Sequence, residues 1–198
     1  KFKIDVKLSN MKVSYRETIR KSYTQRTKFK KQSGGHGQYG EVEILFEPTK
    51  DYSQSYTFKE KVFGGAVPKA YFPAVEKGFR EAMRTGTFAG YAVDSFKVNL
   101  TDGSFHPVDS DALSFELAAR MGYKESGRAA GAVILEPIMK IEVITPEENM
   151  GDIVGDLNRR RGQVNDMGDR NGAKTIKADV PLSEMFGYVT TLRTLSSG

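Results

Sequence analysis

The sequence predicts an α+β protein of two domains, and three observations support that prediction. In the first half, Val42, Ile44 and Phe46 alternate with Glu41, Glu43 and Leu45, as in a half-buried strand. The second half follows the order strand, helix, strand, strand, helix. Between the halves, residues 127–131 are small and flexible, so the domains are placed at 1–129 and 130–198.

The first half is predicted to contain two further strands and a helix. Strands are expected at 56–63 and 96–100, and a helix at 72–83, where apolar residues recur at helical spacing. The polar stretch 50–55 predicts a turn, and 101–108 predicts a loop because it carries glycine and proline.

A second helix of the first half is expected to begin beside this loop. Asp109 or Ser110 can cap it, because either side chain can accept a free backbone N–H. The residues predicted to form its apolar stripe are Leu113, Leu117 and Met121.

The segment from His106 to Asp111 also matches H-x-x-D-x-D, a pattern that can bind a divalent metal. A metal-dependent hydrolase using His106, Asp109 and Asp111 is therefore one alternative. Capping explains the two aspartates without a metal, and we favour it. His106 is then an exposed loop histidine, which can also donate to a phosphate or ribose.

The second half begins with a strand at 138–144 and a strong helix start. Thr145 stands at the cap position, Pro146 at the first helical position and Glu148 three residues after the cap. The residues predicted to form one apolar face of this helix are Met150, Ile153, Val154 and Leu157.

Three consecutive arginines, Arg159, Arg160 and Arg161, stand in the last turn of this helix, and Gly162 is expected to end it. Cations suit the helix dipole, but the dipole needs only one of them. We therefore favour a role for the arginines in binding RNA phosphate over dipole complement alone.

The rest of the second half predicts a hairpin and a final helix. Asn171-Gly172 is a hairpin signal between strands near 163–168 and 176–180, and a helix follows with Met185, Val189 and Leu192. This order is that of a ferredoxin-like split βαβ unit without its last strand.

Composition narrows the classes of function. The net charge is +5 and the pI about 9.2, which suits a polyanionic partner. The absence of cysteine excludes disulfides and thiolate metal sites and fits a reducing compartment. No apolar run is long enough to span a bilayer.

Residues 18–40 contain no acid but six cations, which predict a solvated strand face or a phosphate-facing stripe: Arg20, Lys21, Arg26, Lys28, Lys30 and Lys31.

The stretch Gly35–Gly40 matches G-x-G-x-x-G, and with Val42 it matches a kinase glycine loop. It leads into a strand instead of a helix, and the other kinase motifs are missing, so neither nucleotide-binding interpretation is favoured. A glycine-rich hairpin tip, or a flexible tip whose backbone approaches RNA closely, fits better. With no Walker A motif or nucleophile elbow either, we expect no catalytic or cofactor site in this chain.

Several segments together resemble domains IV and V of the elongation factor G family of ribosomal translocases. For domain IV they are VSYRETI (13–19), QSGGHGQYG (32–40), GGAVPK (64–69) and DGSFHPVDS (102–110). For domain V they are LEPIMK (135–140), GDIVGDLNRRRG (151–162) and VPLSEMFGY (180–188).

The resemblance implies a mixed-sheet first domain of the ribosomal-protein-S5-like type, which enters the decoding site, and a ferredoxin-like second domain beside ribosomal RNA. Together with the charge pattern it gives these expected RNA-contacting residues: Gln32, Ser33, Gly34, Gly35, His36, Gly37, Gln38, His106, Arg20, Lys28, Lys30, Lys31, Arg159, Arg160 and Arg161.

The resemblance also implies a cytoplasmic, monomeric factor that binds the ribosome, its RNA, the tRNA and mRNA of the decoding site, and ribosomal proteins near the factor-binding centre, but no membrane. GTP and Mg²⁺ are expected in a domain N-terminal to this sequence. His36 stands where the family usually has arginine. A specialised paralogue with a recycling or stress role, or a ribosome-associated RNA-binding module without a motor, is the alternative.

Overall fold

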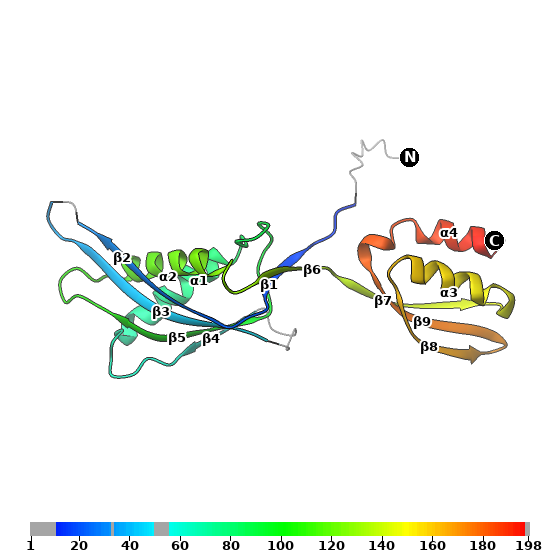
Figure 1. Ribbon diagram of the computed structural model, residues 1–198, viewed down its shortest axis with the longest axis horizontal. Helices are drawn as coiled ribbons and strands as arrows, with labels where there is room; N and C mark the ends of the chain where they lie inside the picture. The colour runs from blue at the N-terminus through cyan, green and yellow to red at the C-terminus, as the bar shows by residue number, and fades with distance from the viewer. Residues whose placement is uncertain (1–10, 33, 50–55, 197–198) are drawn as a thin grey trace, which may run out of the picture. The chain divides into compact units, whose positions relative to one another are not determined.

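The structure is a computed structural model that describes residues 11–32, 34–49 and 56–196. The described residues form two compact units (Figure 1). The first unit is Tyr15–Leu135, and the second comprises residues 136–196, with which 11–14 are grouped. The first unit extends to Leu135, past the predicted boundary at 129 and 130, because β6 (Ala132–Leu135) pairs antiparallel with β1 (Arg16–Ile19).

The first unit contains a mixed four-stranded sheet. Its order is β2 (Tyr23–Lys31), β3 (Gln38–Pro48), β5 (Phe96–Ser104) and β4 (Tyr56–Glu60). The β2–β3 and β3–β5 pairs are antiparallel, whereas β4 and β5 are parallel. A parallel pair needs a crossover, and the segment containing α1 (Phe72–Ala82) provides it. The predicted α+β class is confirmed.

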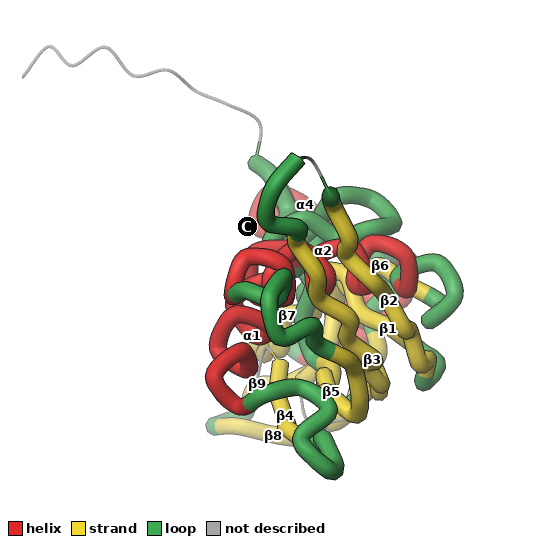
Figure 2. Tube along the Cα trace, turned by 90° about the vertical axis from the view of Figure 1, so that its left-hand side faces the viewer, coloured by secondary structure: helices red, strands yellow, loops and turns green. Residues whose placement is uncertain are grey.

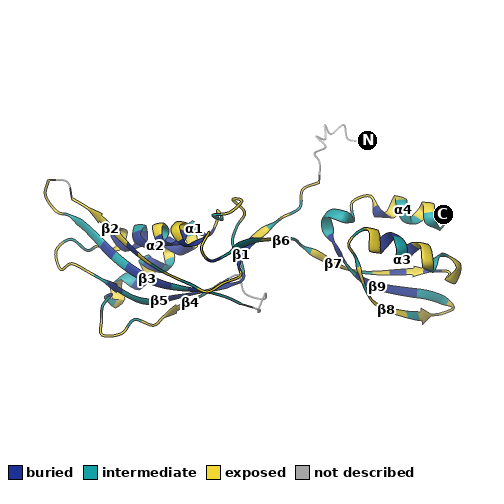
Figure 3. Ribbon diagram, viewed as in Figure 1, coloured by how far each residue is buried: buried dark blue, intermediate teal, exposed yellow. Residues whose placement is uncertain are grey.

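Two helices, α1 and α2 (Ala112–Ser126), cover one face of this sheet (Figure 2). Val42, Ile44 and Phe46 are buried in the core, as the alternating pattern predicted. Figure 3 shows the resulting alternation of buried and half-buried residues along β3. The helices pack closely at Gly78, where an added Cβ would lie 2.4 Å from the Glu116 carbonyl oxygen. A network of polar side chains from β2, β3 and β5 lies on the opposite face.

Two predicted element boundaries in this unit are wrong. The strand expected at 56–63 ends at Glu60. Strand β5 continues to Ser104, so only the end of the predicted 101–108 loop is a loop. Gly103 does not break the strand but permits a close approach, since a Cβ there would lie 2.2 Å from the Glu41 carbonyl oxygen. The turn predicted at 50–55 lies outside the described residues.

The predicted apolar stripe of α2 is also wrong. Leu113 is 49% exposed and Met121 is 37% exposed. The face that packs inward carries mainly small and aromatic side chains: Phe115, Ala118, Ala119, Gly122 and Tyr123. Small residues allow α2 to approach α1 and the sheet closely. This close packing stabilises the fold more than burying the leucine face of α2 would.

The second unit has the predicted order of elements. Strand β7 (Ile138–Thr145) is followed by α3 (Met150–Arg159), β8 (Gln163–Arg170), β9 (Ala173–Pro181) and α4 (Tyr188–Leu195). The sheet order is β7-β9-β8, and both pairs are antiparallel. Crossing from β7 through α3 to an outer strand gives the split βαβ arrangement expected for a ferredoxin-like domain.

The hairpin between β8 and β9 is confirmed. Asn171 and Gly172 have φ values of 52° and 82°, both positive as a type I′ turn requires. On α3, Ile153 and Leu157 are fully buried and Met150 and Val154 pack beside them, so the predicted apolar face is confirmed as well.

The predicted helix start at Thr145 is wrong. Thr145 remains paired with Lys174 as the last residue of β7, and its hydroxyl donates to the Pro146 carbonyl at 3.3 Å. A 3₁₀ turn at Glu147–Asn149 then precedes α3. Pairing with β9 thus outweighs the local capping signal. Within the described residues, the structure contains no helix long and apolar enough to cross a bilayer.

Candidate RNA-contacting surface

The hairpin tip between β2 and β3 and the loop after β5 lie at the same end of the sheet (Figure 1). Asp109 joins them through two hydrogen bonds. The Gly37 amide donates to the Asp109 carboxylate at 3.1 Å, and the Tyr39 amide donates to the Asp109 carbonyl at 2.8 Å. The two segments expected to contact RNA are therefore one connected surface.

Ser110 adds a second connection. Its hydroxyl accepts from the His106 amide at 2.8 Å and donates to the Tyr39 carbonyl at 2.7 Å. Neither Ser110 nor Asp109 caps α2, so that prediction is wrong. The cap is Asp111, whose carboxylate accepts from the Ser114 amide at 2.6 Å. Because Asp111 takes the cap, Asp109 and Ser110 can hold the loop to the tip.

The His106 side chain is 52% exposed, and the backbone amides of two following residues of the loop hold its ring. Its Nδ1 accepts from the amides of Val108 at 3.3 Å and Asp109 at 3.2 Å. This pattern assigns the proton of the neutral imidazole to Nε2. His106 therefore presents an N–H donor on the side of the ring turned away from the loop.

The metal-site alternative has no support in this geometry. Nδ1 of His106 already accepts backbone amides, and Asp111 is used as the helix cap. Across the part of the chain that the structure describes, no cluster of three or more His, Cys, Asp or Glu side chains could hold a metal ion.

Glycines shape the backbone of the hairpin tip. Gly34 and Gly35 have φ values of 39° and 127°, which side-chain-bearing residues rarely adopt. A Cβ on Gly37 would lie 2.9 Å from the Asp109 carboxyl carbon, so glycine also permits the contact between tip and loop. Gln32 and His36 are exposed beside them, whereas Ser33 lies outside the described residues.

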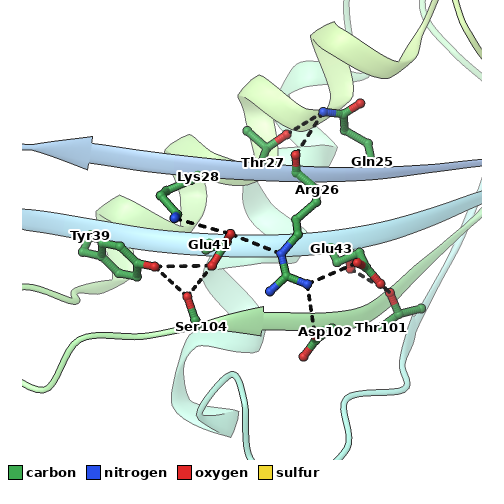
Figure 4. A network of polar contacts seen from close by, with 10 residues as sticks. All are labelled: Gln25, Arg26, Thr27, Lys28, Tyr39, Glu41, Glu43, Thr101, Asp102 and Ser104. Atoms are coloured by element: carbon green, nitrogen blue, oxygen red, sulfur yellow. Dashed lines mark hydrogen bonds and ion pairs between the residues drawn. The ribbon is translucent and has the colours of Figure 1, made fainter.

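Arg26 belongs to a polar network on the open face of the sheet and not to a free cationic stripe (Figure 4). Its guanidinium contacts Glu41 at 3.1 Å, Asp102 at 2.9 Å and Glu43 at 3.2 Å. Hydrogen bonding to Glu41, then to Asp102, raises the pKa of Arg26. Burial tends to raise the pKa of Glu41, but hydrogen bonds from Ser104 and Arg26 outweigh it and lower that pKa.

The remaining cations of the stripe differ in how far they are neutralised. Lys28 lies 3.8 Å from the Glu41 carboxylate and 5.8 Å from the centre of the Tyr39 ring (Figure 4). Lys30 and Lys31, at the tip end of β2, are exposed, and neither forms an ion pair with another described residue. Arg20 is exposed just after β1. Lys30 and Lys31 thus add positive charge beside the tip.

We expect Lys30→Gln combined with Lys31→Gln to flatten the salt dependence of RNA binding. Each lost single-strand phosphate contact removes about 0.7 from the slope of log affinity against log salt, so the pair should remove about 1.4. Fluorescence anisotropy with a single-stranded oligonucleotide measures this. Lys59→Gln with Lys61→Gln, two exposed cations elsewhere, is the control, and an equal change in both pairs would return Lys30 and Lys31 to a solvated role.

Of the three arginines at the end of α3, Arg160 is turned inward. It contacts the Asp156 carboxylate at 2.8 Å and the Thr191 hydroxyl at 3.0 Å, and it donates to the Glu184 carbonyl. Its guanidinium lies 5.1 Å from the centre of the Tyr188 ring. Arg160 therefore connects α3 to α4 and the segment before it.

Arg161 is held by two carboxylates, with a bidentate pair to Glu136 at 2.8 and 2.9 Å and a contact to Glu184 at 3.1 Å. It has a φ of 58°, so the left-handed position usually taken by glycine is occupied by arginine. Gly162 follows, and its amide closes the helix on the Leu157 carbonyl at 2.9 Å. Arg159, 74% exposed, is the one of the three most open to a phosphate.

Comparisons with known proteins define the class of this chain. The family model described as elongation factor G, domain IV, matches residues 11–131, and that of the elongation factor G C-terminus matches residues 133–198. The chain is thus a pair of adjacent domains of a translation elongation factor. It belongs to the elongation factor G family.

Individual relatives support the same family. Elongation factor G of Cytophaga hutchinsonii is 53% identical over 197 residues, an alignment that covers 100% of this chain and 28% of that protein. A crystal structure of a protein from Thermus thermophilus matches with a TM-score of 0.85 and 40% identity, covering 96% of this chain and 28% of that one. The chain therefore spans about 28% of the length of these relatives.

Proposed function

We propose that this chain is the C-terminal, RNA-contacting part of a translational GTPase that promotes movement of tRNA and mRNA on the ribosome during elongation. Membership of the elongation factor G family supports the parent activity. The observation that carries the role of this chain is the joined surface at one end of the sheet, where Asp109 connects the hairpin tip to the His106 loop.

The chemistry of this surface suits RNA. His106 presents an Nε2–H donor that can bond a ribose hydroxyl, a phosphate or a base edge. Gln32 and Gln38 flank a tip whose glycines let the backbone approach closely, and Lys30 and Lys31 supply charge for phosphates. We propose that the tip contacts tRNA and mRNA in the decoding site of a cytoplasmic ribosome.

In the second unit, Arg159 is proposed to contact ribosomal RNA, near the ribosomal proteins of the factor-binding centre. We propose a monomeric parent protein, whose GTP and Mg²⁺ belong to a further domain. The described residues contain neither a phosphate-binding loop of the Walker A kind nor a metal-binding cluster, and no step of hydrolysis is assigned to them.

A specialised paralogue, acting in ribosome recycling or under stress, is the second candidate. His36 favours it, because an exposed imidazole stands at the tip where the family usually has an arginine. An RNA-binding module without a motor is the third. A GTPase domain upstream in the native gene would rule out the third.

His106→Asn in the full-length parent is expected to slow translocation at least about tenfold, equal to about 1.4 kcal/mol of barrier. The asparagine oxygen can still accept the two loop amides, so the loop keeps its shape while the outward Nε2–H is lost. GTP hydrolysis should stay near normal, and stability should change by less than about 0.5 kcal/mol, as at an exposed site.

A pre-steady-state translocation assay beside a GTPase assay measures this. Val108→Ala, at a 62% exposed residue of the same loop, is the matched control and should translocate normally. Equal translocation rates for His106→Asn and wild type would remove the imidazole from the proposed function.

A further inference from the structure

The first unit contains a second cationic surface, away from the tip. A groove of about 660 Å³ lies between the C-terminal parts of α1 and α2, with Thr85–Thr87 on one side. One acid, Glu81, and three cations line it: Arg120, Lys124 and Arg128. Its size is that of a ligand site, and none of the residues predicted to contact RNA lines it.

The cations of this groove share one side of α2 and its continuation, because they are spaced four residues apart. Successive members are offset by about 6 Å along a helix axis, so they can meet successive phosphates of one strand. Arg120 lies 3.6 Å from Glu81 and 3.9 Å from Glu116, beyond close hydrogen-bond contact. Lys124 and Arg128 are exposed, and neither forms an ion pair with another described residue.

The loop beside the groove is bonded to a buried carboxylate and exposes an aromatic ring. The buried Glu17 carboxylate, 1% exposed, accepts from the amides of Ala89 at 2.7 Å, Phe88 at 3.1 Å and Tyr91 at 3.1 Å. Gly86 fits against it only because it has no side chain, as a Cβ would lie 2.1 Å from a Glu17 oxygen. The loop thereby holds Phe88 outward, 60% exposed.

We propose that this groove binds the sugar-phosphate backbone of a single-stranded or looped RNA segment, and that Phe88 stacks on an unpaired base beside it. Cations along a groove with an adjacent exposed aromatic ring are the features of single-strand RNA binding. An acidic peptide could pair with the cations, but a nucleic-acid strand supplies both the phosphates and the bases that stack on an exposed ring. Helix-dipole complement does not explain Arg120, which lies outside the last turn of α2. The inference rests on the proposed function for the presence of RNA.

The test uses the whole 198-residue chain in the Lys30→Gln, Lys31→Gln background, so that the groove is measured apart from the tip. The probe is a single-stranded uridine oligonucleotide, followed by fluorescence anisotropy over a salt series. Lys124→Gln with Arg128→Gln should flatten the log–log salt slope by about 1.4, at about 0.7 per contact. The matched control is Lys59→Gln with Lys61→Gln, which should leave the slope unchanged.

Phe88→Ala should weaken binding about fivefold to 150-fold at fixed salt, the equivalent of about 1–3 kcal/mol of stacking, with the slope unchanged. Equal slopes for the groove and control pairs would overturn the proposal. So would poly-glutamate binding that needs Lys124 and Arg128 and that the oligonucleotide does not displace. If the groove variants leave RNA binding unchanged while His106→Asn still slows translocation, the groove proposal is rejected and the proposed function stands.

Discussion

Glu17→Ala is expected to lower the free energy of unfolding of the first unit by roughly 3–5 kcal/mol, because three backbone amides lose a charged, buried acceptor at once. Removing the buried charge recovers part of this cost. The stability of Glu17→Gln should lie between that of the wild type and that of Glu17→Ala. One oxygen of Glu17 accepts from both Ala89 and Tyr91, and a glutamine oxygen can keep both bonds.

Urea unfolding of the chain, followed by hydrogen exchange of β3 amides, measures the effect in the first unit. Glu60→Ala, at an exposed residue of β4, is the control and should change stability by less than about 0.5 kcal/mol. A loss no larger for Glu17→Ala than for Glu60→Ala would show that the loop does not depend on the carboxylate.

Arg160→Met is expected to lower the free energy of unfolding of the second unit by about 2–4 kcal/mol. The substitution leaves Asp156, 8% exposed, without its closest cation, and unpairing a buried charge costs about 3–5 kcal/mol. The lower range applies because the Arg160 side chain keeps 18% exposure. The contacts to Thr191 and the Tyr188 ring are lost as well.

Arg159→Met is the matched control, because it makes the same change one residue earlier at a side chain that is 74% exposed. Its effect should stay below about 0.5 kcal/mol, as for a surface ion pair. Hydrogen exchange of β9 amides reports on the second unit alone. Similar losses for the two variants would mean that Arg160 does not connect α3 to α4.

The periodicity of apolar residues correctly predicted which side chains of β3 and α3 are buried, because that pattern is set by residues only a few positions apart. Val42, Ile44 and Phe46 became the buried side of β3, and Ile153 and Leu157 the buried face of α3. Capping was predicted less well because several residues offered the same chemistry. Asp111 took the cap position on α2, and strand pairing kept Thr145 out of the cap of α3.

Contacts between distant parts of the chain could not be predicted from pattern. Asp109 meets Gly37 across 72 positions, and Glu17 meets Phe88 across 71. Glu17 stands in a strand of mixed polarity, where glutamate ordinarily points to solvent. Three adjacent arginines cannot share one direction on a helix, because successive residues differ by about 100°. That geometry could have indicated that Arg160 or Arg161 turns inward. The RNA contacts themselves stay predictions, carried by the resemblance and by charge.

Strand β3 has a mechanical consequence for the tip. It runs unbroken from Gln38 beside the tip to Pro48 beyond the buried Phe46, with β2 on one side and β5 on the other. A force pushing the tip toward the sheet is resisted in shear, so the load is shared among many ladder hydrogen bonds at once. The tip is thus attached to the core through a strand that is paired on both sides. A force applied along these strands from the core is therefore passed to whatever the tip touches, instead of bending the hairpin.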